Sequence, residues 1–317
     1  MKILIIGGAE FIGPVVARHL ANAGHDITVF HRTPAPQIPY PQIAGDCESV
    51  DQLYKGMQSV QPDAVVHTTA LCGRQVKAVE QALAGRKTRM ILLSSVDVYK
   101  AFEVVNRLSD APVQSVPLHE RSPLRDVLYP YRGRRPDTET AHDMQTLHDY
   151  EKITVERAAL ESSVIDAVIL RLGMVYGRND YNHRFGEPVR KMYQGDKFIE
   201  LPQKVAEFRA CKCFVEDIAH GVRLAVESDV SGEIYNLAAQ EVLSEMEWYQ
   251  RTAELMNWKG TITVSEESGL TDSFNPEQHL VVDTAKIRKE LHYKELFSVQ
   301  EGLRHTIQWE LENVQSY

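Results

Sequence analysis

The first residues able to do chemistry form a glycine-rich turn close to the start of the chain. The segment Gly7-Gly8-Ala9-Glu10-Phe11-Ile12-Gly13 follows an apolar run and precedes residues at helical spacing. Small residues in such a turn let backbone N–H groups approach a pyrophosphate, and the start of the next helix adds partial positive charge. A tight turn that binds nothing would also use glycine. The strand–turn–helix context favours dinucleotide binding, with Gly7, Gly8, Phe11, Ile12 and Gly13 against the cofactor.

Three further residues bear on which dinucleotide would bind. An acidic residue at the end of the second strand would hydrogen-bond the adenine ribose and favour NAD. That run instead ends with His31 and Arg32, and a cation there suits a 2′-phosphate unless Arg32 is only a solvated surface residue. Asp46, after the third short strand, is placed to accept from the adenine amine. The sequence therefore predicts NADP or NAD, with NADP favoured.

Ser95 is a candidate for the reacting end of a substrate. It closes the apolar run that begins near Met90. Open α/β sheets bind ligands at the carboxyl ends of their strands, so its hydroxyl is placed to hydrogen-bond a reacting carbonyl. The alternative is that the hydroxyl only satisfies the end of its own strand.

The elements that must position these residues are read from the apolar pattern. Five near-continuous apolar runs are typical of strands buried on both faces of a parallel sheet: 2–6, 26–30, 64–67, 90–94 and 167–171. Amphipathic stretches separate them, and strand–helix alternation predicts a doubly wound α/β domain of Rossmann type. A smaller C-terminal α/β substrate domain is expected after it.

The later part of the chain has a different texture. Residues 99–137 hold five prolines, with five arginines from Arg121 to Arg135, and predict a long loop, followed by a helix from about Thr140 to Glu161. We place the domain boundary near Gly177, with residues 1–177 binding the dinucleotide and 178–317 mostly binding substrate. The segment from about 212 to 240 is expected to return to the first domain. Helices are predicted over 181–194, 216–227, 244–256 and 299–312.

Composition excludes several classes of protein. The chain has 317 residues, and Lys+Arg 35 against Asp+Glu 44 gives a net charge of −9, which disfavours nucleic acid and anionic membranes as partners. We find no apolar segment of membrane-spanning length. Four cysteines do not make a disulfide framework, and the twelve histidines are scattered, so no metal site is expected. We expect a cytoplasmic protein.

Several motifs together resemble the extended short-chain dehydrogenases/reductases, which include nucleotide-sugar epimerases, dehydratases and reductases. The opening turn resembles the family's Gly-Gly-x-Gly-Phe-Ile-Gly, and 63–67 resembles its fourth strand. Ser94-Ser95-Val96-Asp97-Val98-Tyr99 matches the fifth-strand end, where Ser95 takes the catalytic Ser/Thr position. Residues 170–177 resemble the sixth strand and the loop at the nicotinamide, and 214–219 and 234–237 match later landmarks. The resemblance covers most of the chain.

The chain departs from this family at two places. Glu10 replaces the middle glycine of the turn, which places a carboxylate near the expected pyrophosphate. The family's catalytic Tyr-x-x-x-Lys is also missing, because Lys152 matches the lysine and the tyrosine position falls on His148. Tyr150 lies two residues from Lys152, about 200° around a helix, so on a helix the two cannot share a face.

Three interpretations of this second departure stay open. His148 replaces the tyrosine as acid/base, which its ordinary pKa near 6.5 suits. Alternatively, the usual mechanism is lost, and the protein binds its ligand or performs different chemistry. In the third interpretation another tyrosine reaches the site, with Tyr129 and Tyr131 as candidates.

The resemblance implies an NAD(P)-dependent epimerase, dehydratase or reductase that acts by hydride transfer on a nucleotide-linked sugar or similar hydroxylated substrate. Ser95 would hydrogen-bond the substrate oxygen, His148 would exchange its proton and Lys152 would hold the nicotinamide ribose. Arg209 and Lys212 are weaker candidates for the substrate diphosphate. The resemblance also implies a homodimer. The alternative is a catalytically silent NAD(P)-binding sensor or scaffold.

Overall fold

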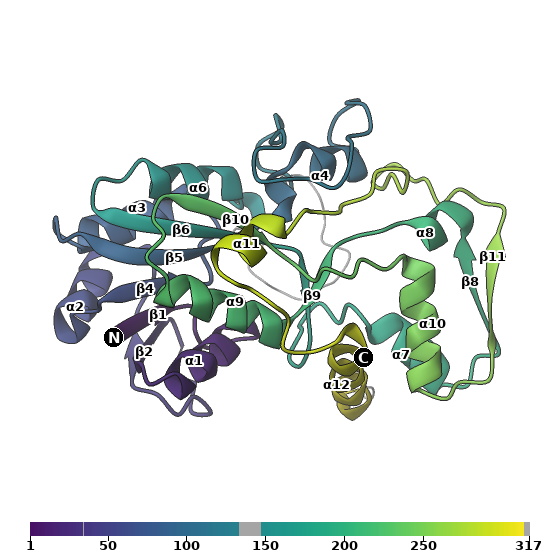
Figure 1. Ribbon diagram of the computed structural model, residues 1–317, viewed down its shortest axis with the longest axis horizontal. Helices are drawn as coiled ribbons and strands as arrows, with labels where there is room; N and C mark the ends of the chain where they lie inside the picture. The colour runs from purple at the N-terminus through teal and green to yellow at the C-terminus, as the bar shows by residue number, and fades with distance from the viewer. Residues whose placement is uncertain (34, 133–146, 314–317) are drawn as a thin grey trace.

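Seven parallel strands form the main sheet of the protein, shown in Figure 1 as a computed structural model that describes residues 1–33, 35–132 and 147–313. The strand order is β10-β6-β5-β4-β1-β2-β3. The strands are β1 (Lys2–Ile6), β2 (Asp26–His31), β3 (Gln42–Ala44), β4 (Ala64–His67), β5 (Thr88–Ser95), β6 (Ile165–Leu172) and β10 (Glu233–Leu237). This arrangement confirms the predicted α/β fold with a doubly wound parallel sheet.

Helices cover both faces of the sheet, as the apolar runs predicted. In β1, Ile3 and Ile5 pack in one core cluster while Leu4 and Ile6 pack in another, because successive side chains point to opposite faces. The helices α1 (Ile12–Asn22) and α9 (Val215–Glu227) lie on the first face. The second face is covered by α2 (Val50–Val60), α3 (Gly73–Ala82) and α6 (Lys152–Leu160).

A second, smaller part of the chain lies beyond the carboxyl ends of these strands (Figure 1). It contains two parallel strand pairs: β8 (Phe198–Pro202) with β11 (Thr261–Ser265), and β7 (Met174–Tyr176) with β9 (Lys212–Phe214). Its helices are α7 (Gly186–Tyr193), α8 (Gln203–Glu207), α10 (Glu245–Leu255) and α12 (Val299–Asn313). A short helix, α11 (Ala285–Glu290), lies beside β10, which pairs with β6 in the main sheet.

Two expectations about the middle of the chain are corrected. The region after Tyr99 is not all loop, because a 3₁₀ turn at Val96–Val98 leads into α4 (Lys100–Val105). The helix predicted from Thr140 to Glu161 is interrupted, and α6 begins only at Lys152. Glu151 has an extended backbone (φ −158°, ψ 91°), and its side chain accepts a hydrogen bond from the Ile153 N–H, so it caps the helix. Residues 133–146 lie outside the described ranges.

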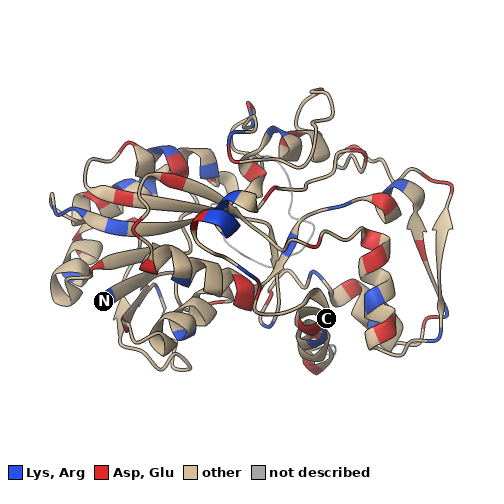
Figure 2. Cartoon of the chain, in the orientation of Figure 1, with Lys and Arg blue, Asp and Glu red and all other residues tan. Residues whose placement is uncertain are grey.

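Charged residues are distributed over both parts of the molecule. Figure 2 shows acidic and basic residues interspersed on most helices. Within the described ranges, no helix has the length and apolar character needed to cross a bilayer.

Candidate active site

The glycine turn between β1 and α1 is too tight for side chains at two of its positions. Gly7 has φ +86°, and a Cβ there would lie 2.3 Å from Cγ2 of Thr69. A Cβ on Gly13 would lie 2.5 Å from both the Gly7 carbonyl oxygen and the Gly8 Cα. Because backbone cannot move aside as a flexible side chain can, this turn requires glycine. The cradle fits a pyrophosphate at the start of α1.

The rest of the turn packs on the sheet and on a later loop. A Cβ on Gly8 would meet Val29 at 2.8 Å, whereas Phe11 is buried with φ 42° just before Ile12 opens α1. The ring of Tyr181 meets the Phe11 ring edge-on, with centroids 6.0 Å apart. Glu10 is exposed, so water screens its repulsion of a bound diphosphate.

A small cavity lies at the carboxyl ends of β2 and β3. It measures about 280 Å³ and is lined by His31, Ala35, Pro36, Gln42 and Ala44. His31 is buried, and its Nε2 lies 2.8 Å from Oε1 of Gln42. Its Nδ1 has no hydrogen-bond partner among the described groups.

The other two residues predicted for the adenosine end differ in their surroundings. Arg32 directly follows His31 in the chain and is exposed. The Asp46 carboxylate accepts a hydrogen bond from the Glu48 N–H at 2.9 Å and thus shapes the turn before α2. The adenine contact predicted for Asp46 stays a prediction.

Polar side chains converge at the carboxyl end of β5. The Ser95 hydroxyl accepts a hydrogen bond from the Asp97 N–H at 3.2 Å, and the Tyr150 hydroxyl donates to Oδ2 of Asp97 at 2.5 Å. The Ser95 hydroxyl also lies near enough to the Tyr150 phenol to lower its pKa, against the larger effect of burial. Lys152 Nζ lies 5.7 Å from the centre of the Tyr150 ring. The site thus contains a serine, a tyrosine and a lysine, although the sequence lacks the usual spacing.

The extended backbone of Glu151 explains how Tyr150 and Lys152 reach one site. In extended chain, residues two apart point to the same side. Tyr150 and Lys152 therefore lie on the same side of the chain, where Tyr150 bonds Asp97 and the charge of Asp97 acts on Lys152, while the side chain of Glu151 points the other way. The helical geometry that excluded Tyr150 was wrong, because the helix does not begin until Lys152.

A buried ion pair holds this segment in place. Arg125 and Glu151 lie 3.0 Å apart with fully buried side chains. Arg125 also donates from Nε to the Asp97 carbonyl and from Nη1 to the Val127 carbonyl, and Glu151 accepts from the Tyr129 N–H. The pair therefore connects the turn after β5, the loop before residue 132 and the start of α6.

Burial changes the acidity of the groups at this centre. Burial lowers the pKa of Lys152 to about 8, although Asp97 and Glu156 oppose the shift. Burial, and then the charge of Asp97, raises the pKa of Tyr150 well above its ordinary value. Burial also raises the pKa of Asp97, against the hydrogen bond from Tyr150. Of the three ammonium protons on Lys152, two bond the carbonyls of Ala70 and Leu93, at 2.7 and 2.9 Å.

His148 lies outside this centre. Its side chain is 54% exposed, and Nδ1 lies 3.3 Å from the carboxylate of the adjacent Asp149. Its carbonyl accepts a hydrogen bond from Arg132 at 2.9 Å. The predicted face shared by His148 and Lys152 does not exist, because Asp149–Glu151 are not helical. Its acid/base role stays a prediction that this geometry does not support.

The tyrosines named as alternatives lie nearby in supporting positions. The Tyr131 ring meets the Tyr150 ring edge-on at 5.1 Å, and the Arg132 guanidinium lies 3.5 Å over Tyr129. Sequence reasoning missed Tyr150, Asp97 and the Arg125–Glu151 pair. The available signal was the acidic pair Asp149 and Glu151 before an apolar periodic run, which is typical of a helix start.

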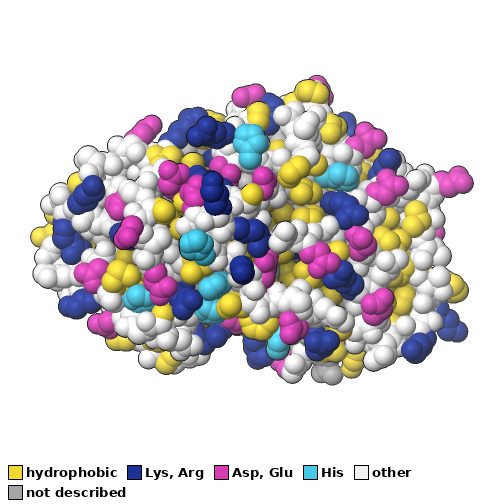
Figure 3. Space-filling view, in the orientation of Figure 1, with side chains coloured by type: hydrophobic (Ala, Val, Ile, Leu, Met, Phe, Trp, Pro, Cys, Tyr) yellow, Lys and Arg dark blue, Asp and Glu magenta, His cyan; other side chains and the backbone are white. Residues whose placement is uncertain are grey.

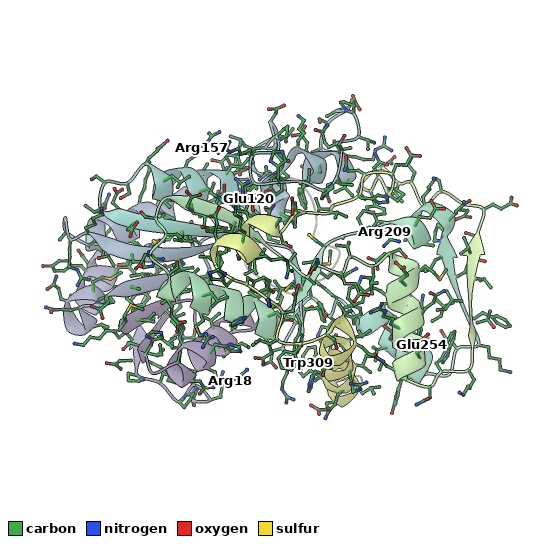
Figure 4. The ribbon with its side chains drawn as sticks, in the orientation of Figure 1. Arg18, Glu120, Arg157, Arg209, Glu254 and Trp309 are labelled. Atoms are coloured by element: carbon green, nitrogen blue, oxygen red, sulfur yellow. The ribbon has the colours of Figure 1, made fainter. Side chains whose placement is uncertain are left out.

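The cations predicted to meet a substrate diphosphate are already paired with α10. Arg209 lies 3.0 Å from Glu247 and donates to the Val242 carbonyl; Figure 4 shows it beside α8 and α10. Lys212 is buried, bonds Glu245 and lies 5.2 Å from the Trp248 ring. Their diphosphate contacts stay a prediction.

Figure 3 shows hydrophobic side chains gathered between the two parts of the molecule.

The chain is similar to curated enzymes over nearly its whole length. It is 22% identical to a dTDP-glucose 4,6-dehydratase of Salmonella typhimurium, over 99% of this chain and 94% of the relative. It is 25% identical to a UDP-N-acetyl-alpha-D-glucosaminuronate decarboxylase of Bacillus cytotoxicus, over 98% and 99% of the two chains.

Solved structures show the same fold. A UDP-glucose 4-epimerase of Thermotoga maritima matches with a TM-score of 0.73 at 15% identity, over 99% of this chain and all of the other. A UDP-glucuronic acid 4-epimerase of Bacillus cereus, in complex with UDP-glucuronic acid and NAD, matches with a TM-score of 0.71 at 20% identity over the full length of both chains. The profile of the NAD dependent epimerase/dehydratase family matches residues 3–238. The chain therefore belongs to the NAD-dependent epimerase/dehydratase family.

Proposed function

We propose that this protein is an NAD(P)-dependent enzyme that oxidises and reduces a carbinol carbon of a nucleotide-linked sugar, with Tyr150 as its acid/base. The observation that carries this proposal is the convergence of Ser95, Tyr150 and Lys152 at the carboxyl end of β5. Open α/β sheets bind their ligands at this edge, and the glycine turn lies at the end of β1 in the same sheet. We assign cofactor binding to residues 1–177 with α9 and β10, and substrate binding mostly to the remainder.

Each residue has a distinct task in this proposal. When bound, the nicotinamide supplies or accepts a hydride. Ser95 donates a hydrogen bond to the substrate oxygen, and Tyr150 transfers a proton at that oxygen. The third ammonium proton of Lys152 would hydrogen-bond the nicotinamide ribose, and the positive charge of Lys152 would offset the negative charge of an ionised neighbour.

The nucleotide-sugar class is supported by the relatives, which are named for dTDP-glucose, UDP-glucose and UDP-glucuronic acid. We infer a preference for NADP from the end of β2. The strand ends at His31 and is followed by the exposed cation Arg32, and no acidic residue stands there to hydrogen-bond the adenine ribose of NAD. A homodimer and a cytoplasmic location remain expectations from the family resemblance.

Two measurements test this function. Fluorescence titration with NADPH and NADH gives the cofactor affinities, and incubation with C4-deuterated UDP-glucose or dTDP-glucose detects transfer of the label to the cofactor. We expect Tyr150→Phe to lower transfer by about 10²- to 10⁴-fold while cofactor affinity is retained. His148→Ala, the matched control, should transfer the label as the unmodified protein does.

The outcomes separate the competing interpretations. Loss of transfer in His148→Ala with normal transfer in Tyr150→Phe would return the acid/base role to His148. Tight cofactor binding without any transfer by the unmodified protein would favour the silent sensor or scaffold.

A further inference from the structure

Asp97 is a buried carboxyl group in direct contact with the candidate acid/base. Only 4% of the residue is exposed. One carboxylate oxygen, Oδ2, accepts the Tyr150 hydroxyl at 2.5 Å, and the other, Oδ1, is buried with no hydrogen-bond partner among the described residues. A buried carboxylate oxygen without a partner is costly as an anion. Asp97 is therefore placed both to receive a proton from Tyr150 and to hold it.

Tyr150 needs such a partner if it is to act as a base. Its phenol is protonated at neutral pH, because burial and the charge of Asp97 raise its pKa. Two of the three Lys152 protons bond backbone carbonyls, and the described residues show no hydrogen bond from Lys152 to the phenol, whose ring centre lies 5.7 Å from Nζ. A neutral phenol can accept a proton from a substrate only if it releases its own. The hydrogen bond to Asp97 shows where that proton goes.

We propose that Asp97 accepts the phenolic proton of Tyr150 at the moment when Tyr150 takes the proton of the substrate hydroxyl. This inference rests on the function proposed above. The O–H bond of the substrate breaks as a new O–H bond forms on Tyr150. The original O–H bond of Tyr150 breaks as one forms on Asp97. The carbinol C–H pair leaves as hydride to the oxidised nicotinamide, so the carbon is oxidised to a carbonyl and the nicotinamide is reduced.

The reverse half-reaction uses the same atoms in the opposite order. Asp97 returns its proton to Tyr150, and Tyr150 protonates the carbonyl oxygen while the hydride comes back to carbon. Because Asp97 is buried, the stored proton is shielded from solvent between the two halves. Asp97 acts through Tyr150 and also positions it, so a test must separate proton transfer from simple support.

The charges around the pair are balanced. Asp97 faces Tyr150, Lys152 and Arg125, with Glu151 as the neighbouring acid. Tyr150 also contacts Tyr131 and Ser95. Lys152 and Arg125 thus oppose Asp97 and Glu151, and protonation of Asp97 during oxidation leaves this centre with one net positive charge. That charge favours an anionic substrate beside it.

The first readout needs no substrate. Ultraviolet absorbance of phenolate is followed against pH in the full chain, and the difference between unmodified protein and Tyr150→Phe isolates Tyr150. The same difference is measured in the Asp97→Asn background. We expect Tyr150 to ionise at lower pH in Asp97→Asn, because a carboxylate neighbour is gone. Identical titration in both backgrounds would show that the two groups do not interact and would overturn the inference.

The second readout is label transfer from C4-deuterated UDP-glucose to NADP⁺ against pH. In unmodified protein we expect the rate of oxidation to fall on the acid side as Asp97 becomes protonated. In Asp97→Asn this acid-side fall of the pH profile should disappear, and the rate of oxidation should drop by about 10²- to 10⁴-fold. In Asp97→Glu part of the rate and the acid-side fall should return. Asp272→Asn, an exposed carboxyl, is the control and should match unmodified protein.

The outcomes of the two readouts distinguish the proposals. An unchanged acid limb in Asp97→Asn, even at a lowered rate, would show that Asp97 only supports Tyr150. No transfer by unmodified protein would overturn the proposed function and the role of Asp97 with it, while the phenolate titration would still report on the contact.

Discussion

The buried pair of Arg125 and Glu151 gives the sharpest test of how this site is held together. Both side chains are fully buried, and the guanidinium makes contacts to Asp97, Val127 and Glu151. Arg125→Leu removes all of these and leaves the charge of Glu151 in the interior. Among the described residues, the Glu151 carboxylate would keep the N–H donors of Tyr129 and Ile153.

The magnitude follows from that orphaned charge. Breaking a buried ion pair by removing one partner costs about 3–5 kcal/mol of folding free energy. An exposed pair costs about 1 kcal/mol or less. Lys191 and Glu187 on α7 form such a pair at 2.8 Å, with side chains 36% and 57% exposed. Lys191→Ala is therefore the matched control, and its effect should be several-fold smaller.

The assay is urea unfolding followed by circular dichroism. Arg125→Leu should lower the unfolding free energy by about 3–5 kcal/mol. Adding Glu151→Gln removes the orphaned charge yet keeps an acceptor for both N–H groups, so the double variant should be more stable than Arg125→Leu alone. If Glu151→Gln instead destabilises further in that background, or if Arg125→Leu matches Lys191→Ala, charge burial at this pair is not what fixes the segment.

Three further predictions concern the cofactor and the acid stability of the fold. Gly13→Ala should weaken NADPH binding by more than about tenfold, because its Cβ would meet backbone at 2.5 Å. Gly24→Ala strains a backbone at φ +87°, but its Cβ meets no other atom and it lies away from the turn, so it should leave the fluorescence titrations of cofactor binding unchanged. Arg32→Ala should weaken NADPH by about tenfold and leave NADH unaffected; equal losses for both would remove Arg32 from phosphate recognition. Burial would raise the pKa of Glu103, but hydrogen bonds from Lys100, Ser109 and two backbone N–H groups outweigh it and lower the pKa to about 2. Between pH 4.5 and 2 the unfolded chain therefore binds more protons at this residue than the folded chain, so the free energy of unfolding falls as the pH drops through this window. In Glu103→Gln, unfolding measured against pH should show a smaller fall.

The fold was predictable because its signal is spread over many residues. The central strands of the sheet are buried on both faces, so nearly every residue of 2–6, 64–67 and 90–94 had to be apolar. The glycine turn was predictable for a similar reason, since Gly7 and Gly13 stand where no Cβ fits. Small errors in element boundaries change neither conclusion.

The catalytic centre depended on the conformation of a single residue. Extending the helix through Glu151 placed His148 over Lys152 and turned Tyr150 away, and the extended backbone of Glu151 reverses both results. What fixes that backbone is a long-range contact, because Arg125 lies 26 residues away in the chain. Periodicity within the 148–156 segment contains no information about that partner.

The unusual spacing of Tyr150 and Lys152 does not by itself imply lost chemistry. On a helix, residues four apart are separated by about 6 Å along the axis, at 1.5 Å per residue. In extended chain, residues two apart are separated by about 6.6 Å, at 3.3 Å per residue. Both geometries place the two side chains on one side at nearly the same separation. The segment Tyr150-Glu151-Lys152 therefore presents a phenol and an ammonium to one site as a Tyr-x-x-x-Lys helix would, and Glu151 is left free to bind Arg125 on the opposite side.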